Sequence, residues 1–296
     1  MRPGFIFFVV ATVAVASCAP SGSPSPDAAV QVVATTTVFA DLVAEVGGDR
    51  VAVRSLVPAG GEPHTFDPRP SDVTAFADAD LVVMNGLGLD DWVVDLVSEA
   101  GSEAPVLRLA EDLPGAGYIG DEEGGTNPHL WLNAAYAICY VERIAAALAD
   151  VDPYGADGYT QRGAAYVADL NELDAFAGNE LGAIPAERRR VVSFHDAFPY
   201  FAAAYGLEVV GTVVGAPGQD PSAGQVARLI DAIRASGAQA ILAEDQFPSE
   251  LVDVIGAETN ATVVSDLYTD SLGDPPGDSY AGMLRWDVER ITEALR

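Results

Sequence analysis

Short apolar runs rich in β-branched residues alternate with amphipathic, alanine-rich segments over most of this chain of 296 residues. Strands buried on both faces read as continuous apolar runs, and parallel strands are joined by helices that cover the sheet. The alternation therefore predicts an α/β fold, in which mostly parallel sheets are flanked by helices. Strands are expected in the first half at 31–36, 51–57, 81–85 and 106–109, and in the second half at 190–194, 208–214, 240–243 and 262–265.

Helices are expected between these strands, and one long segment separates the two groups of strands. The shorter helices are expected at 38–47, 70–77, 91–100, 134–149, 222–236, 249–259 and 279–295. Residues 154–181 place apolar side chains at three- and four-residue spacings, which favours one long helix. Gly163 and Gly178 each weaken that helix by up to ~1 kcal/mol relative to alanine. The sequence thus predicts an N-terminal lobe at 30–153, a connector helix at 154–184 and a C-terminal lobe at 185–296.

The N-terminus predicts export. One arginine precedes an apolar run at 5–16, which is too short to span a bilayer and is followed by small residues, as in a secretory signal peptide. The segment Val-Ala-Ser-Cys resembles the lipobox of bacterial lipoproteins, which implies cleavage before Cys18 and a diacylglyceryl anchor on its thiol. An ordinary signal peptide with a coincidental cysteine is the alternative. We expect a signal peptide at 1–17, a lipidated flexible tether at 18–29, and a protein held on the outer face of the bacterial cytoplasmic membrane.

Composition excludes several classes of function. The formal charge of −29 argues against nucleic acid as a partner and favours the attraction of cations. All 15 basic residues are arginine, so a P-loop lysine, a Schiff-base lysine and a lysine general base are impossible. The enzyme signatures G-x-S-x-G and H-E-x-x-H are absent from the sequence as well. A solvated acidic surface is the alternative explanation of the charge, and common enzyme signatures are absent from the sequence.

The only 3 histidines stand in distinctive contexts. His64 follows the second predicted strand, His195 directly follows the strand at 190–194, and His129 follows an Asn-Pro pair that restricts its loop. Ligands of open α/β sheets lie outside the carboxyl ends of the strands, so we expect all three at a cleft between the lobes. Neutral imidazoles bind borderline transition metals, and three of them supply most of a zinc site. Their motifs are G-G-E-P-H-T-F-D-P-R-P-S-D at 60–72, N-P-H-L-W-L at 127–132 and S-F-H-D-A-F-P-Y-F at 193–201.

These motifs resemble those of the metal-binding lipoproteins of bacterial ABC importers, the zinc/manganese branch of the periplasmic binding proteins. The resemblance extends over residues 30–296 and includes P-S-A-G-Q-V at 221–226 and Y-T-D-S-L followed by G-D-S-Y within 268–280. It implies metal ligands at His64, His129, His195 and Asp270, two from each lobe. It also implies a monomeric receptor, not an enzyme, that captures a divalent transition metal and delivers it to a cognate permease and its ATPase.

Three imidazoles and one carboxylate suit Zn²⁺, whereas Mn²⁺ is harder and gains from a second carboxylate. Family members that favour manganese tend to carry glutamate in place of His195, so the resemblance implies zinc, with manganese or mixed Zn/Mn binding as the alternative. Glu244 and Asp196 are candidates to accept the second N–H of a histidine. The acidic segment 121–123 is expected to attract cations, unless it is an ordinary solvated loop.

Two other classes of function stay open. A secreted zinc hydrolase needs an open coordination position at which water is activated, and Glu244 is the candidate base. Closure of the shell by Asp270 removes that position. In an adhesin or surface scaffold the metal is structural, so that its removal unfolds the protein.

Overall fold

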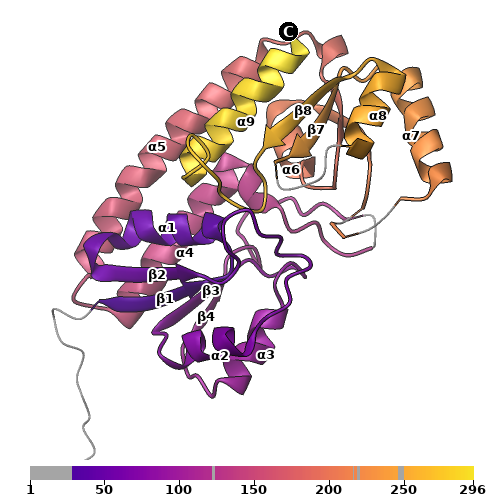
Figure 1. The fold of residues 1–296 in the computed structure, drawn as a ribbon. Helices are drawn as coiled ribbons and strands as arrows, with labels where there is room; N and C mark the ends of the chain where they lie inside the picture. The colour runs from indigo at the N-terminus through magenta and orange to yellow at the C-terminus, as the bar shows by residue number, and fades with distance from the viewer. Residues whose placement is uncertain (1–28, 122–123, 216, 219–220, 246–249) are drawn as a thin grey trace, which may run out of the picture.

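The computed structural model describes residues 29–121, 124–215, 217–218, 221–245 and 250–296, and their strands form two sheets (Figure 1). Both are parallel four-stranded sheets within the described residues, with orders β2-β1-β3-β4 and β6-β5-β7-β8. The predicted fold class, two α/β lobes joined by one long helix, is therefore confirmed. The strands are β1 Val30–Ala34, β2 Val51–Ser55, β3 Leu81–Met84, β4 Val106–Arg108, β5 Arg190–Ser193, β6 Glu208–Thr212, β7 Ala240–Glu244 and β8 Thr262–Leu267.

Helices cover both faces of each sheet. One group is shared by the two lobes and forms a middle layer, while a second group covers the outer face of each sheet (Figure 1). The middle layer comprises α1 Thr37–Gly47, α4 Ala134–Val151, α5 Ala156–Gly182, α6 Pro199–Tyr205 and α9 Tyr280–Leu295. The outer helices are α2 Pro70–Ala77 and α3 Trp92–Glu99 in the N-terminal lobe, and α7 Ala223–Ser236 and α8 Glu250–Thr259 in the C-terminal lobe.

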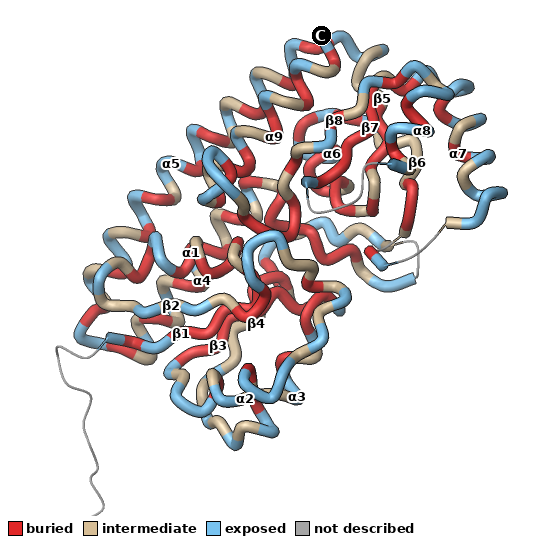
Figure 2. Tube along the Cα trace, in the orientation of Figure 1, coloured by how far each residue is buried: buried red, intermediate tan, exposed pale blue. Residues whose placement is uncertain are grey.

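Alternate residues of each strand belong to different cores, because successive side chains of a strand point to opposite faces of the sheet. In β1, Val32 packs into the middle layer and Val33 packs under the outer helices. In β7, Leu242 packs into the middle layer and Ile241 packs under α7 and α8. The buried residues of the middle layer belong to one continuous cluster that reaches both sheets. Figure 2 shows buried segments, in red, along the helices and strands of both lobes. The two lobes are thus joined through a common core as well as through the chain.

The long helix α5 runs along both lobes as the connector (Figure 1). It begins two residues later than predicted, because Asp152 and the proline after it form a turn that Arg50 and Tyr159 hold through hydrogen bonds to the Asp152 carboxylate. Gly163, which weakens the helix, lies where α4 packs closely. A Cβ atom at this position would lie 3.2 Å from the Cβ of Ala145, so the glycine permits the close approach of the two helices.

The short helix α6 was not among the predicted elements. It lies within the motif that carries His195, starts with Pro199 in its first turn and ends at Gly206 in the left-handed conformation. Proline at the start and glycine at the end are ordinary helix boundaries, but seven residues are too few to show a clear hydrophobic period. Tyr200 and Phe201 of this helix are buried in the shared core.

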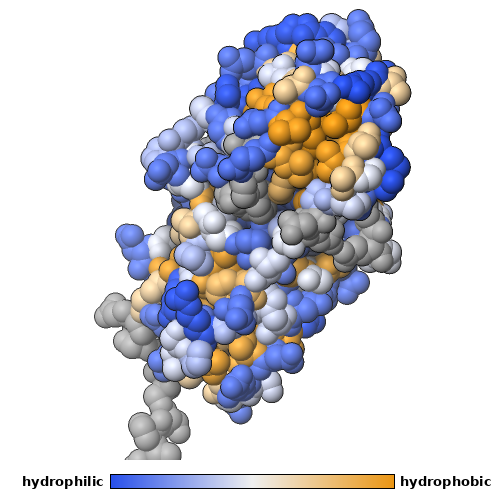
Figure 3. Space-filling model, turned by 45° about the vertical axis from the view of Figure 1, so that its right-hand side comes forward, coloured by the Kyte–Doolittle hydropathy of each residue, from blue (hydrophilic) through white to orange (hydrophobic). Residues whose placement is uncertain are grey.

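The C-terminal lobe carries apolar side chains at its surface (Figure 3). Val254 of α8 is 56% exposed, and Val226, Ile230 and Leu251 on α7 and α8 are partly buried. Among the described residues, no helix combines the length and the apolar character needed to cross a membrane. The predicted signal peptide and Cys18 lie outside the described residues.

The packing of α5 predicts a contrast between two adjacent residues. Leu170 is 0% exposed in the shared core, whereas Asn171 is exposed on the same helix. Leu170→Ala should lower the free energy of unfolding of the metal-free protein by about 2–5 kcal/mol, since it leaves a cavity. Asn171→Ala should change it by less than about 0.5 kcal/mol. Urea denaturation measures both changes. Equal effects would contradict the conclusion that the buried face of α5 stabilises the fold.

Candidate metal centre

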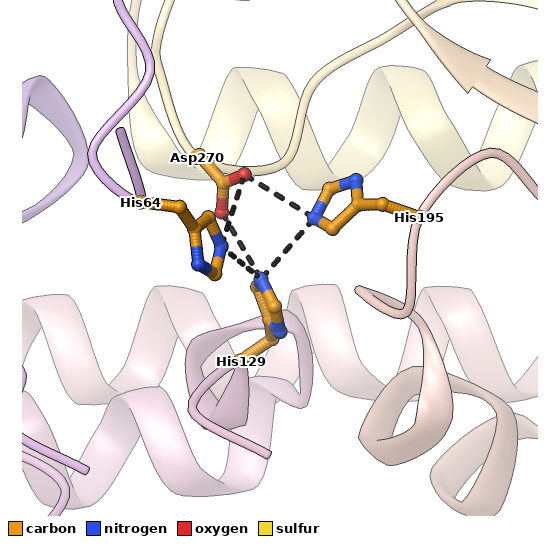
Figure 4. Close-up of side chains that lie close together, drawn as sticks. All are labelled: His64, His129, His195 and Asp270. Carbon is orange, nitrogen blue, oxygen red and sulfur yellow. Dashed lines mark hydrogen bonds and ion pairs between the residues drawn. The ribbon is translucent and has the colours of Figure 1, made fainter. Parts of the chain in front are cut away.

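The four residues that the sequence singled out as ligands come together at the seam between the lobes (Figure 4). His64 lies in the loop after β2, and His129 directly precedes the short 3₁₀ helix Leu130–Leu132. His195 follows β5 and Asp270 follows β8. One ligand atom from each residue lies within 4.8 Å of the other three. Residues far apart in the sequence therefore form one compact group of donor atoms.

The spacing of these atoms fits a single small cation. The Nε2 atom of His129 lies 3.1 Å from Nε2 of His64 and 3.3 Å from Nε2 of His195. The carboxylate oxygens of Asp270 lie 3.3 Å from His195 Nε2, 3.4 Å from His129 Nε2 and 3.9 Å from His64 Nε2. A tetrahedral ion with ligands at about 2.0–2.1 Å separates them by roughly 3.3–3.4 Å. All three rings thus turn Nε2 toward the position that such an ion would occupy.

Asp270 is the most demanding member of the group. Its side chain is 0% exposed, and among the described residues neither carboxylate oxygen has a hydrogen-bond partner beyond the rings of His129 and His195. A buried carboxylate without hydrogen bonds is costly unless it is paired with a cation or coordinates a metal. Oδ1 faces His129 and Oδ2 faces His195, so both oxygens point into the group. This geometry can supply one or two oxygen donors.

The electrostatics of the metal-free site favour a cation. Burial opposes ionisation of Asp270, but His129 and His195 more than offset it and hold the pKa of Asp270 well below its usual range. Burial lowers the pKa of His64 to about 3, so its ring is neutral at pH 7. Burial also opposes protonation of His195, yet Glu244 and Asp270 raise the pKa of His195 well above its usual value. An entering metal ion therefore has to displace a proton from His195.

Glu244, one of the two residues that the sequence indicated as candidate acceptors for a histidine N–H, lies beside His195. Nδ1 of His195 lies 2.8 Å from Oε1 of Glu244, which is 1% exposed at the end of β7. A histidine that donates Nδ1–H to a carboxylate presents Nε2 to a metal and is fixed in orientation. β5 and β7 are neighbours in one sheet, so this pair lies wholly within the C-terminal lobe.

The other candidate, Asp196, reaches a histidine through an intermediary. Its carboxylate accepts a hydrogen bond from Nδ2 of Asn127, and Oδ1 of Asn127 faces Nδ1 of His129 at 3.0 Å. Sequence reasoning passed over Asn127, although it belongs to the N-P-H motif. It also passed over Glu62, which accepts a hydrogen bond from the backbone N–H of His64. Asn127 and Glu62 each lie two residues before a histidine. This spacing is the sequence feature that could have identified them as partners of the histidines.

The loop that carries Asp270 is held by the opposite lobe on both sides. Nε1 of Trp131 donates a 2.8 Å hydrogen bond to the carbonyl oxygen of Thr269. The backbone N–H of Gly60 donates a 2.8 Å hydrogen bond to Oγ of Ser271. The carboxylate between these two anchors is therefore fixed relative to the N-terminal lobe.

A cavity of about 240 Å³ opens beside His64 and His129. A water molecule occupies about 30 Å³ of liquid, so this cavity is large enough for a hydrated ion. Asp121 lines it, whereas the other two acidic residues of segment 121–123 lie outside the described residues. Its lining includes His64, His129, Asp121, Asn127 and Asp196.

Two α/β lobes with a cluster of metal donors at their seam define a class, the two-lobed receptors that bind a solute between their lobes. Known proteins narrow this class. Residues 32–294 match the family described as zinc-uptake complex component A, periplasmic. The chain belongs to this family of receptors, which are not enzymes, and it is the substrate-binding component of a metal ABC importer.

Individual relatives are named for different metals. The manganese-binding lipoprotein MntA of Halalkalibacterium halodurans is 29% identical over 294 residues, with 98% of this chain and 97% of that protein covered. The iron ABC transporter substrate-binding lipoprotein MtsA of Streptococcus pyogenes serotype M1 is 30% identical, covering 90% and 88%. The periplasmic zinc-binding protein TroA of Treponema pallidum has a TM-score of 0.83 at 28% identity, covering 90% and 99%.

The pairing of His195 with Glu244 predicts how the metal-free protein responds to pH. Because the folded state raises the pKa of His195, its contribution to stability is complete below about 6.5, the usual histidine value, and is lost as pH rises through the folded pKa. Glu244→Gln should lower the pKa of His195 and weaken this dependence. Titration of the ¹⁵N-histidine resonances measures the pKa. Glu172→Gln, on the exposed face of α5, is the control, and an unchanged His195 pKa in Glu244→Gln would contradict the assignment.

Proposed function

We propose that this receptor captures Zn²⁺ with His64, His129, His195 and Asp270 and delivers it to its permease. The observation that carries the proposal is the convergence of three Nε2 atoms and a buried carboxylate, with separations of 3.1–3.9 Å. Three imidazoles and a carboxylate suit four-coordinate zinc. The ion is held between the lobes and undergoes no reaction there. Residues 30–153 and 185–296 form the two lobes, and residues 154–184 form the connector.

Manganese is the second candidate, and the orientation of Asp270 favours it. Both oxygens of Asp270 face ring nitrogens, so the carboxylate can bind through two oxygens and raise the number of donors to five. A harder ion gains from additional oxygen ligands. The relatives are named for manganese, iron and zinc. Affinity order favours zinc over manganese at a given site, so supply of the metal also contributes to what is carried.

The position of Glu244 argues against a hydrolase. A general base has to lie within reach of the water that it activates, but Oε1 of Glu244 lies 2.8 Å from Nδ1 of His195, on the side of the ring away from Nε2. Asp270 also occupies the fourth side of the donor group. Both observations support a closed binding site.

The place of the protein in the cell follows from the proposed anchor. Processing before Cys18 leaves a lipid on its thiol and holds the receptor, as a monomer, on the outer face of the cytoplasmic membrane. Released metal passes to the permease, and the ATPase on the other side of the membrane supplies the energy. Asp121 at the cavity beside the site attracts cations from the medium.

Competitive metal titration of the soluble protein from Ser21 onward tests the site. We expect one tight Zn²⁺ per chain and weaker binding of Mn²⁺. His195→Ala and Asp270→Ala should each weaken Zn²⁺ binding by about 100-fold or more, because each removes one of four ligands. Asp274→Ala, an exposed carboxylate in the same segment, should leave the affinity unchanged. Comparable Mn²⁺ affinity would favour the mixed-metal receptor, and absence of a tight site would refute the proposal.

Acid should weaken binding. The pKa of His195 is raised in the metal-free protein, so below that pKa the ion displaces a proton and the logarithm of the apparent affinity should rise by about one per pH unit. Calorimetry in buffers of different ionisation enthalpy should detect about one proton released per Zn²⁺ at pH 7. Affinity that is the same at pH 5 and pH 7.5 would count against imidazole ligands.

A further inference from the structure

Asn127 is buried, with 1% of its surface exposed, and each of its polar atoms has a hydrogen-bond partner. Its backbone N–H donates to the carbonyl oxygen of Ile119 at 2.9 Å, and its carbonyl oxygen accepts from the hydroxyl of Tyr200 at 3.0 Å. Its side-chain nitrogen donates to Asp196, at 2.6 Å to the carbonyl oxygen and at 3.1 Å to Oδ2. Its side-chain oxygen faces the backbone N–H of His129 at 3.1 Å and the ring Nδ1 of His129 at 3.0 Å.

These contacts decide which way the amide points. A carbonyl oxygen and an ionised carboxylate can only accept hydrogen bonds, so Nδ2 of Asn127 has to face Asp196. Oδ1 then faces His129, and an oxygen acceptor requires that Nδ1 of the ring carries a proton. Nδ1–H leaves Nε2 as the nitrogen available for a metal. The orientation of one amide thereby selects the ligating nitrogen of His129.

The selection depends on both lobes. Asn127 and His129 belong to the N-terminal lobe, whereas Asp196 and Tyr200 belong to the C-terminal lobe. His195 is different, because Glu244 lies in the same sheet and stays beside it whatever the other lobe does. If the lobes separate, His195 keeps its carboxylate, but Asn127 loses both acceptors of its NH₂ group and only the backbone N–H of His129 still orients its oxygen.

We propose that Asn127 is a positioning residue that prepares His129 for the metal only while the lobes are together. The proposal rests on the metal-binding function proposed above. Separation of the lobes leaves the backbone N–H of His129 as the remaining contact that orients the amide, and an amide that turns against it presents its NH₂ group to Nδ1. An NH₂ donor at Nδ1 favours the proton on Nε2, and a protonated Nε2 cannot bind metal. Release of the ion is thereby coupled to the loosening of one lobe.

Two substitutions separate the roles of the amide. Asn127→Ala removes both the acceptor for His129 and the donor to Asp196. Asn127→Asp keeps an acceptor for Nδ1–H but places a second carboxylate against Asp196, so the side-chain tie to Asp196 is lost while the backbone tie to Tyr200 remains. Asn171→Ala on the exposed face of α5 is the matched control. With only 3 histidines in the chain, ¹⁵N-histidine spectra resolve each ring, and His64 and His195 report whether the variants fold.

In the metal-free wild type, and in Asn127→Asp, Nδ1 of His129 should carry a proton. In Asn127→Ala this signature should be lost, and Zn²⁺ affinity should fall about 10- to 100-fold, as is usual for partners of metal-bound histidines. Asn127→Asp should recover much of that affinity but release Zn²⁺ several-fold faster than the wild type. An added carboxylate by itself attracts the cation, so faster release reports the lost tie.

Wild-type Nδ1 protonation and affinity in Asn127→Ala would overturn the proposal, as would identical spectra for Asn127→Ala and Asn127→Asp. Slower Zn²⁺ release from Asn127→Asp than from the wild type would overturn the dependence on both lobes. If the wild type binds no Zn²⁺, the proposed function fails. The Nδ1 signature of the metal-free protein still decides whether Asn127 positions His129.

Discussion

The site is built around a buried negative charge whose polar neighbours are the rings of the three histidines. Asp270 is 0% exposed, and its oxygens face Nε2 of His195 at 3.3 Å and Nε2 of His129 at 3.4 Å. The neighbouring rings partly compensate, since the pKa of His195 is raised and that ring carries a proton in the metal-free state. One protonated ring compensates the charge of Asp270 less completely than a metal ion that contacts all four side chains. The negative charge at the seam of the two lobes is therefore incompletely compensated in the metal-free protein and favours the binding of a divalent cation.

Contacts between the lobes hold the loop that carries Asp270 in position. The loop after β8 is tied to the N-terminal lobe by the hydrogen bond from the backbone N–H of Leu272 to Oγ1 of Thr37, at 2.8 Å. The hydroxyl of Tyr280, at the start of α9, donates to the carbonyl oxygen of Trp131 at 2.7 Å. The middle layer of helices forms one core with both sheets. Large independent swings of the lobes would break this core, so the expected motion is a small loosening rather than a wide opening.

Sequence reasoning recovered what depends on local pattern. The alternation of apolar runs gave both sheets and the connector, the ends of strands located His64 and His195, and the Asn-Pro pair located His129. It could not give the contact between Asn127 and Asp196, which are 69 residues apart and meet only because the lobes pack together. Nor could it show that Val32 and Leu242 share one core, since periodicity reveals that a strand is buried and not which element covers it. The same limit applies to the metal, because relatives of this chain are named for manganese, iron and zinc.

Burial also explains how tight capture and release can occur at one site. The side chain of Asp270 is 0% exposed, and the attraction between its carboxylate and a cation is strong where water is excluded, because it falls as the effective dielectric constant rises. A slight separation of the lobes that admits water would hydrate the carboxylate and weaken its hold on the ion. The same separation would remove the contacts of Asp196 with Asn127. Loss of affinity therefore requires no large displacement of any ligand, and a permease that loosens one lobe can obtain the metal from an otherwise intact receptor.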